Sequence, residues 1–259
     1  RDSLGPMFGE QPIEMAMSGA ESQIVEELRS VKRYRDLFED AYPGQEINLD
    51  NARLALASFV RSLVSANAPF DAFVQGQSDA LSQAAQRGVE LFYSDRLGCS
   101  ACHAGFDFTT ATRSQASSGR QESPFHNIGL YNLDGNGAYP RSAQGLIADT
   151  GLERDMGRFR VPSLRNVALT APYGHDGSVA SLDQFIRIYE AGGRHIEAGP
   201  LAGDGRRSPL RSTQLREFEL SESERNDLLA FLESLSDSDF VNNPKHAPVD
   251  GKPVEATDL

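Results

Sequence analysis

The two cysteines of this 259-residue chain lie three residues apart and are followed at once by a histidine, in the run Cys99-Ser100-Ala101-Cys102-His103. One helical turn places two thiols at this spacing on the same side, where each can add to one vinyl group of a haem. The histidine that follows can then bind the iron. The spacing therefore indicates a covalently attached c-type haem, and in bacteria this attachment occurs outside the cytoplasm.

Other uses of two neighbouring cysteines fit the sequence less well. A zinc site needs about four ligands, but the chain has no further cysteine and its next histidine is His126. A thioredoxin-type redox pair is expected in a strand–helix–strand context, and the sequence predicts no confident strand. A pair of structural cysteines is the remaining alternative.

The ligand on the far side of the iron would decide what the haem does. A thioether raises the potential and suits electron transfer, a phenolate favours oxidised iron, and an empty position admits peroxide. Four downstream side chains are candidates: His126, Met156, His175 and Tyr189. By spacing alone Met156 is the natural ligand. Tyr189 belongs to an apolar stripe at helical spacing, which is typical of core residues.

Capping residues followed by apolar positions at helical spacing predict the elements that position this motif. The predicted helices cover residues 18–37 with a break near Ser30, 49–65, 82–93, 181–192 and 221–235. Ser18, Ser181 and Ser221 are the predicted N-terminal caps. The class expected from this pattern is all-α with large loops.

Residues between the predicted helices form long polar segments. Residues 67–76 are predicted to be a linker, and the part after Ser236 an extended tail. Residues 104–158 are rich in Gly, Ser, Thr and Asn, which predicts long loops with little regular structure. Loops of this length are uncommon unless they serve a function, so we expect them to wrap a cofactor.

Composition excludes some classes of partner. With 25 Lys and Arg against 37 Asp and Glu, the formal net charge is −12, which argues against non-specific binding of nucleic acid. No apolar stretch approaches the ~18 residues of a membrane span. The chain opens at Arg1 without a signal peptide, and we expect it to be a fragment or processed form that lacks upstream sequence.

Longer motifs resemble a known family. The run from Phe159 to Gly177, FRVPSLRNVALTAPYGHDG, and its order after Gly98-Cys99-Ser100-Ala101-Cys102-His103 resemble the signature of the bacterial di-haem cytochrome c peroxidase and MauG superfamily. PFHNIGLYN at 124–132 and MGRFR at 156–160 resemble the MbnH branch, di-haem enzymes of methanobactin gene clusters and their relatives. The resemblance covers about Gly5 to Leu235.

This resemblance implies two c-type haems, each in a cytochrome c-like domain. The C-x-x-C-H motif of this chain stands at the position of the second haem, so the first motif is expected upstream of Arg1. Residues 1–77 would be the remainder of the first, peroxidatic domain. Residues 78–240 would form the second haem domain, and residues 241–259 an extended tail.

The resemblance also implies the far-side ligand. Ordinary peroxidases of the family place a methionine on the helix after the His-x-Gly turn, and MauG-like members place a tyrosine there. In this chain that position is Tyr189. The resemblance therefore favours Tyr189 as the ligand and makes Met156 a loop residue.

Further roles are implied by the same resemblance. Glu14, with Pro6 beside it, would lie on the distal side of the first haem, where Glu14 would act as acid–base in cleaving peroxide. Backbone carbonyls of Thr170 and Pro172 would bind calcium between the haems, and Arg165 could pair with a haem propionate. From the residues alone, Glu14 could instead be an exposed carboxylate and Pro172 could form a rigid turn. Arg165 could instead form a structural ion pair.

The expected function is that of a periplasmic di-haem oxidase of the MauG and MbnH type. Hydrogen peroxide would form high-valent haem, and the stored equivalents would oxidise a partner protein. A di-haem cytochrome c peroxidase that draws electrons from a small redox protein is the first alternative. A non-catalytic electron-transfer cytochrome c is the second.

Overall fold

The structure is a computed structural model that describes residues 19–112 and 124–247. Two compact units divide the chain. One holds the described residues up to Val64 and from His246 on, and the other runs from Ser65 to Lys245. The two compact units meet between Val64 and Ser65. The boundary predicted between residues 77 and 78 separates the expected haem domains, which is a different division, and it stays a prediction.

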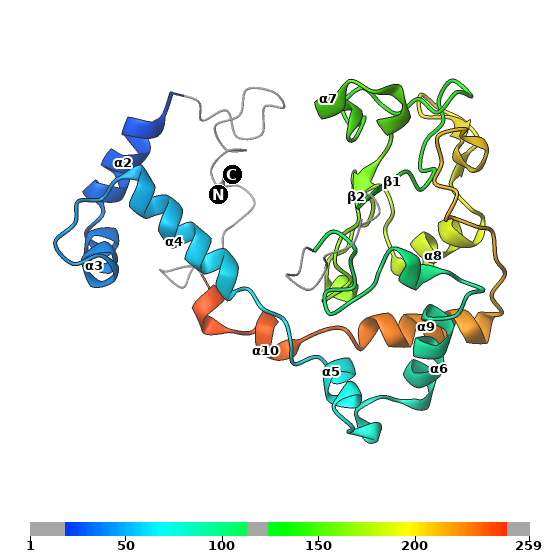
Figure 1. The fold of residues 1–259 in the computed structure, drawn as a ribbon, viewed down its shortest axis with the longest axis horizontal. Coiled ribbons are helices and arrows are strands. Elements are labelled where there is room, and N and C mark those ends of the chain that lie inside the picture. Colours follow the sequence, from blue (N-terminus) through cyan, green and yellow to red (C-terminus); the bar gives the residue numbers. More distant parts are fainter. Residues whose placement is uncertain (1–18, 113–123, 248–259) are drawn as a thin grey trace, which may run out of the picture. The chain divides into compact units, whose positions relative to one another are not determined.

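The described residues of the first unit form three helices: α2 (Glu21–Ser30), α3 (Lys32–Ala41) and α4 (Leu49–Ser62) (Figure 1). The predicted break near Ser30 is confirmed, because Val31 is extended and separates α2 from α3. Helix α2 begins after Ala20, which provides no side-chain cap, and Ser18 lies outside the described residues. Helix α4 begins at the N-cap Asn48, whose side chain accepts a hydrogen bond of 2.9 Å from the backbone of Asn51.

The second unit begins with a helix where the sequence predicted a linker. Helix α5 spans Pro69–Val74, and proline suits its first position because that N–H has no partner within a helix. The carboxylate of Asp71 accepts from the backbone N–H of Ala68 at 2.9 Å. The linker prediction was wrong because so short a helix has too few residues to show a period.

Two longer helices of this unit cross in close contact. Helix α6 (Gln83–Phe92) packs against α9 (Glu222–Glu233). A Cβ atom on Gly88 would lie 2.0 Å from the carbonyl oxygen of Asp227, so only glycine permits this approach. The core beside the crossing includes Phe92, Phe108 and Phe231, which are buried.

Three serines begin helices of the second unit. Ser82, Ser181 and Ser221 accept hydrogen bonds from the third residues of α6, α8 (Leu182–Glu190) and α9. The caps predicted at Ser181 and Ser221 are confirmed. Short elements complete the described helical structure: α7 (Ile147–Thr150), α10 (Ser238–Val241), and 3-10 turns at Ser78–Ala80, Cys99–Ala101, Glu153–Asp155, Val167–Leu169, Gly205–Arg207 and Pro244–His246.

The part after Ser236 was predicted to be extended, which is wrong for its described residues. Helix α10 begins at the N-cap Asp237, whose carboxylate accepts from the backbone of Phe240. The same carboxylate accepts from the backbone N–H groups of Ala66 and Asn67. Contacts with residues far away in the sequence therefore stabilise this turn.

Among the described residues, the strands form two pairs, and each strand has two residues. β1 (Phe125–His126) is antiparallel to β2 (Phe159–Arg160), with His126 opposite Phe159. β3 (His195–Ile196) is antiparallel to β4 (Gly203–Asp204). The all-α class is thus confirmed, and the β1–β2 pair ties the ends of a long loop together.

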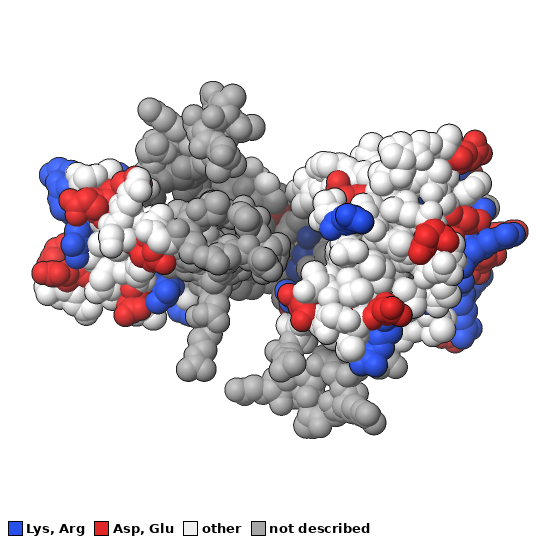
Figure 2. Space-filling view, turned by 90° about the horizontal axis from the view of Figure 1, so that it is seen from above, with Lys and Arg blue, Asp and Glu red and all other residues white. Residues whose placement is uncertain are grey.

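The described surface carries charges of both signs, and these are interspersed on the face seen in Figure 2. None of the described helices is both long and apolar enough to cross a bilayer.

Candidate haem-binding site

The C-x-x-C-H motif forms one tight turn in the second unit. Gly98 has a φ of 65°, in the left-handed region, and directs the chain into the 3-10 turn Cys99–Ala101. The backbone N–H groups of Cys102 and His103 both donate to the carbonyl of Cys99, at 3.3 and 3.0 Å. The two thiols and the imidazole are therefore fixed by hydrogen bonds within five residues.

The His103 ring is oriented by the loop that follows it. Its Nδ1 lies 2.9 Å from the carbonyl oxygen of Phe108. A carbonyl oxygen only accepts, so Nδ1 carries the proton and Nε2 keeps its lone pair. Burial lowers the pKa of His103, although hydrogen bonds to the carbonyls of Phe108 and Pro162 oppose the shift. A neutral ring whose Nε2 carries no proton is what a metal ligand requires.

Phe108 holds this carbonyl in place through an unusual backbone conformation. Its φ is 51°, a region that non-glycine residues adopt at a cost. The side chain is 1% exposed and lies against Phe70, with ring centroids 5.3 Å apart. The backbone of Thr110 donates to the carbonyl of Cys102 at 3.0 Å. Packing on the core thus maintains a loop folded back over the motif.

A cavity of about 600 Å³ adjoins the motif, and Cys99, Cys102 and His103 line it. Its walls come from α6, α8, α9 and the loops at 126–139 and 159–175, and they include Phe92, Leu164, Ile186, Leu228 and Leu232. The volume lies within the range of small-molecule and cofactor sites. An apolar chamber with two thiols and one imidazole at its edge fits a c-type haem.

Tyr189 lines the same cavity from α8. Its ring lies 5.5 Å from that of Phe185, one turn earlier. Burial raises the pKa of Tyr189, and the thiols of Cys102 and Cys99 raise it further. Burial also raises the pKa of the Cys99 thiol to about 12. Without a cation in the cavity, the phenol and this thiol are therefore both neutral.

The other three candidate ligands differ in position. His126 and His175 line the cavity, whereas Met156 is absent from its lining. Met156 packs instead against the buried cluster of Leu130, Tyr131 and Tyr139. This position favours Tyr189, the ligand that the family resemblance implies, over Met156, the ligand that spacing alone suggested.

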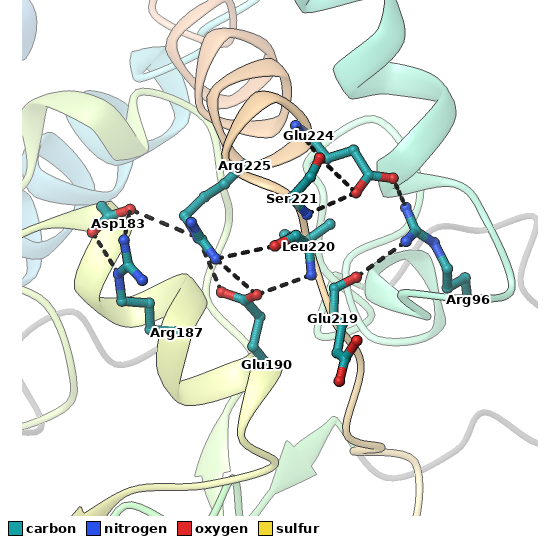
Figure 3. Close-up of polar contacts among 9 residues, drawn as sticks. All are labelled: Arg96, Asp183, Arg187, Glu190, Glu219, Leu220, Ser221, Glu224 and Arg225. Carbon is teal, nitrogen blue, oxygen red and sulfur yellow. Dashed lines mark hydrogen bonds and ion pairs between the residues drawn. The ribbon is translucent and has the colours of Figure 1, made fainter.

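A polar network positions the end of α8 that carries Tyr189 (Figure 3). The Glu190 carboxylate pairs with both Nε and a terminal nitrogen of Arg225 in α9, at 3.0 and 2.9 Å. It also accepts from the backbone N–H of Leu220 at 3.1 Å. The side chains of Arg225 and Glu190 are 11% and 14% exposed. This ion pair links α8 to α9 directly beside the cavity.

Arg165 occupies a different environment from the one expected. Its guanidinium forms two hydrogen bonds of 2.9 Å with the carboxylate of Asp71 in α5, and a third with the carbonyl of Phe106. The side chains of Arg165 and Asp71 are 6% and 10% exposed, and Arg165 does not line the cavity. The geometry favours the structural ion pair over a contact with a haem propionate.

The remaining predicted site residues lie partly outside the described structure. Thr170 and Pro172 line the cavity. In residues 19–112 and 124–247, no group of three or more His, Cys, Asp and Glu side chains could hold a metal ion, so calcium there would depend on carbonyl oxygens. Glu14 and Pro6 lie outside the described residues.

Sequence reasoning missed several residues of the site. The amide oxygen of Gln214 lies 3.4 Å from the Cys102 sulfur, and no spacing rule indicated it. The carbonyl of Phe108 carries no side-chain signal. Ile128, Leu130 and Tyr139 also line the cavity. They belong to the loop expected to wrap a cofactor, and the polar composition of that loop was the signal that could have indicated them.

Comparison with known proteins places these features in a family. Residues 2–79 match the family described as "Di-haem cytochrome c peroxidase". The chain is 35% identical over 225 residues to the methylamine utilization protein MauG of Methylorubrum extorquens, covering 86% of this chain and 54% of that protein. It is 35% identical over 169 residues to the cytochrome c551 peroxidase of Pseudomonas aeruginosa, covering 64% of this chain and 45% of that protein. The chain thus spans about half the length of these relatives.

A solved structure is similar over almost the whole chain. It is described as a MauG-like protein associated with microbial copper homeostasis, and it is 42% identical with a TM-score of 0.86. The similarity covers 94% of this chain and 70% of that one. These similarities, together with the C-x-x-C-H turn and its cavity, show that the chain belongs to the di-haem cytochrome c peroxidase and MauG family.

Proposed function

We propose that this chain carries the second haem site of a di-haem oxidase in which hydrogen peroxide oxidises the haem pair and a partner protein is oxidised in turn. The observation that carries the proposal is Tyr189, which lines the cavity of Cys99, Cys102 and His103, whereas Met156 does not. An oxygen donor stabilises oxidised iron better than a thioether does. A site that stores oxidising equivalents benefits from that preference.

The side chains of the site have complementary tasks. A bound c-type haem would supply reversible one-electron chemistry at its iron. His103 offers its Nε2 lone pair, and the carbonyl of Phe108 holds the Nδ1 proton. Tyr189 offers a phenol oxygen that loses its proton on binding a cation. Apolar walls such as Leu164 and Leu232 exclude water from the cavity.

Peroxide handling is assigned from the family resemblance. Glu14 would move a proton from one peroxide oxygen to the other while the O–O bond breaks, and Pro6 would border the same distal space. A Glu14→Gln variant of the full-length protein should cleave peroxide about a hundredfold more slowly. Cleavage at the wild-type rate would remove Glu14 from the mechanism.

A second candidate is a cytochrome c peroxidase that takes electrons from a small redox protein, because relatives of comparable identity carry that name. The two are separated by adding peroxide to the full-length protein without a reductant. An oxidised haem spectrum that persists for minutes is expected of the oxidase. Peroxide consumption that starts only with reduced cytochrome c would support the peroxidase.

Two further assignments rest on the proposed cofactor and on the family resemblance, respectively. Because bacteria attach c-type haem outside the cytoplasm, we place the protein in the periplasm, and fractionation of cells tests this. Calcium held by the carbonyls of Thr170 and Pro172 would be removed by a chelator. A haem spectrum that is unchanged after chelation, with no calcium in the wild-type protein by elemental analysis, would exclude it.

A further inference from the structure

A second group of aromatic side chains adjoins the haem cavity. Tyr139 and His175 line the cavity, and their rings lie 6.0 Å apart. Tyr131 lies behind Tyr139, with ring centroids 5.5 Å apart in an edge-on arrangement, and is 3% exposed. Electron transfer through proteins slows steeply with distance. Adjacent rings therefore offer short steps away from the cavity.

The phenol groups of the two tyrosines have different partners. The Tyr139 hydroxyl donates to the side-chain amide oxygen of Asn127 at 2.8 Å and accepts from the backbone of Leu130 at 3.1 Å. An amide oxygen is a very weak base. The Tyr131 hydroxyl donates to the carboxylate of Asp176, which is a far stronger base. Of these two phenols, only Tyr131 donates its hydrogen bond to a group basic enough to take the proton.

The surroundings of Tyr131 oppose positive charge on its ring. The guanidinium of Arg194 lies 4.5 Å from the ring centroid, where a cation favours a neutral, electron-rich face. Loss of an electron from Tyr131 alone would place a second positive charge there. Loss of the electron together with the phenolic proton avoids this charge.

Asp176 is suited to receive that proton. Burial raises its pKa, but hydrogen bonds from Tyr131 and Ser178 outweigh the burial, so that the pKa lies below its usual range. The carboxylate is therefore ionised at neutral pH. Asp176 is exposed, which lets an aromatic side chain of another protein approach this part of the surface.

We propose that Tyr131 is a redox-active tyrosine through which the oxidised haem takes electrons from the partner protein. One electron passes from Tyr131 to the oxidised haem c by way of the Tyr139 ring, and the phenolic proton moves to Asp176. A neutral tyrosyl radical and a carboxylic acid remain. An aromatic side chain of the partner then returns one electron to Tyr131, Asp176 returns the proton, and the oxidised partner loses its own proton to water.

This inference rests on the proposed function, since peroxide supplies the oxidising equivalent. The test uses the full-length holoprotein, mixed with one equivalent of hydrogen peroxide and frozen for electron paramagnetic resonance. The wild type should show an organic radical whose signal narrows when the protein carries ring-deuterated tyrosine. Tyr131→Phe should abolish this signal. Asp176→Asn, which keeps the ring, should slow its formation about a hundredfold.

Tyr93→Phe is the matched control. Tyr93 is 46% exposed and contacts the cavity-lining Phe92, with ring centroids 5.2 Å apart, but no carboxylate bonded to its hydroxyl is found among the described residues. The radical yield of Tyr93→Phe should equal that of the wild type. A wild-type radical yield in Tyr131→Phe, or an unchanged rate in Asp176→Asn, would overturn the inference.

A second oxidant separates this inference from the proposed function. A ruthenium tris-bipyridine sensitiser with a sacrificial electron acceptor oxidises haem in light without peroxide. If peroxide leaves the haem spectrum unchanged but light produces the Tyr131 radical, the proposed function fails and electron transfer through Tyr131 stands. If either oxidant changes the haem spectrum and no Tyr131-dependent radical appears, electron transfer through Tyr131 fails.

Discussion

The two sides of the haem cavity are built in different ways. On the near side, backbone hydrogen bonds within residues 99–103 shape the turn that carries the thiols, and the carbonyl of Phe108, five residues further on, orients the His103 ring. On the side proposed for the second ligand, Tyr189 is positioned by an ion pair between Glu190 and Arg225, which are 35 residues apart. The comparison teaches that the C-x-x-C-H turn is a local property of this chain, whereas the position of Tyr189 depends on how two helices pack.

Removing both cysteines should have the largest effect. Cys99→Ser combined with Cys102→Ser leaves no thiol to form a thioether, so we expect complete loss of haem that survives denaturation. Haem staining of a denaturing gel measures this. Met156→Leu is the control and should keep the band. A stained band in the double variant would show that attachment does not depend on the near-side turn.

Replacing the far-side phenol should change the haem without releasing it. Tyr189→Phe removes the oxygen donor but keeps the ring that packs on Phe185. We expect haem content to stay constant while the optical and magnetic resonance spectra of the ferric protein change. If Met156→Leu changes these spectra and Tyr189→Phe leaves them intact, the far side carries a thioether ligand and our comparison is wrong.

Weakening the ion pair that holds α8 should have an intermediate effect. Glu190→Gln removes the charge that faces Arg225, and we expect a loss of about 2 kcal/mol in the free energy of unfolding, because the pair is largely buried. Urea unfolding of the holoprotein measures the change. The exposed pair of Arg187 with Asp183 is the control, and Arg187→Ala should cost about 0.5 kcal/mol or less. Equal losses would show that burial does not distinguish the pairs.

Removing the cap of α8 should have the smallest effect. Ser181→Ala deletes the hydroxyl that accepts from the backbone of Gln184 at 3.2 Å, and we expect a cost of about 1 kcal/mol. Ser223→Ala, at an exposed position of α9, should leave the stability unchanged. The Ser181→Ala variant should also keep its haem covalently attached, since the cap lies on the far side only.

Local signals predicted the described helices with clear caps. Ser181 and Ser221 begin α8 and α9 as expected, because an N-cap hydrogen bond spans three residues and is visible in the sequence. The same reasoning missed α5 and α10, which are too short for a period. Asp71 in the first turn of α5 and Asp237 at the N-cap of α10 are bound by groups 94 and 170 residues away.

The sequence by itself determined the C-x-x-C-H turn and the all-α class, because both follow from hydrogen bonds between near neighbours. Only the tertiary structure decided that Met156 lies outside the cavity, that Arg165 pairs with Asp71, and that the Tyr131 phenol meets the Asp176 carboxylate. Each of these depends on which distant segments pack together. Packing sets the charge, burial and distance of a pair of side chains, and no spacing along the chain encodes those quantities.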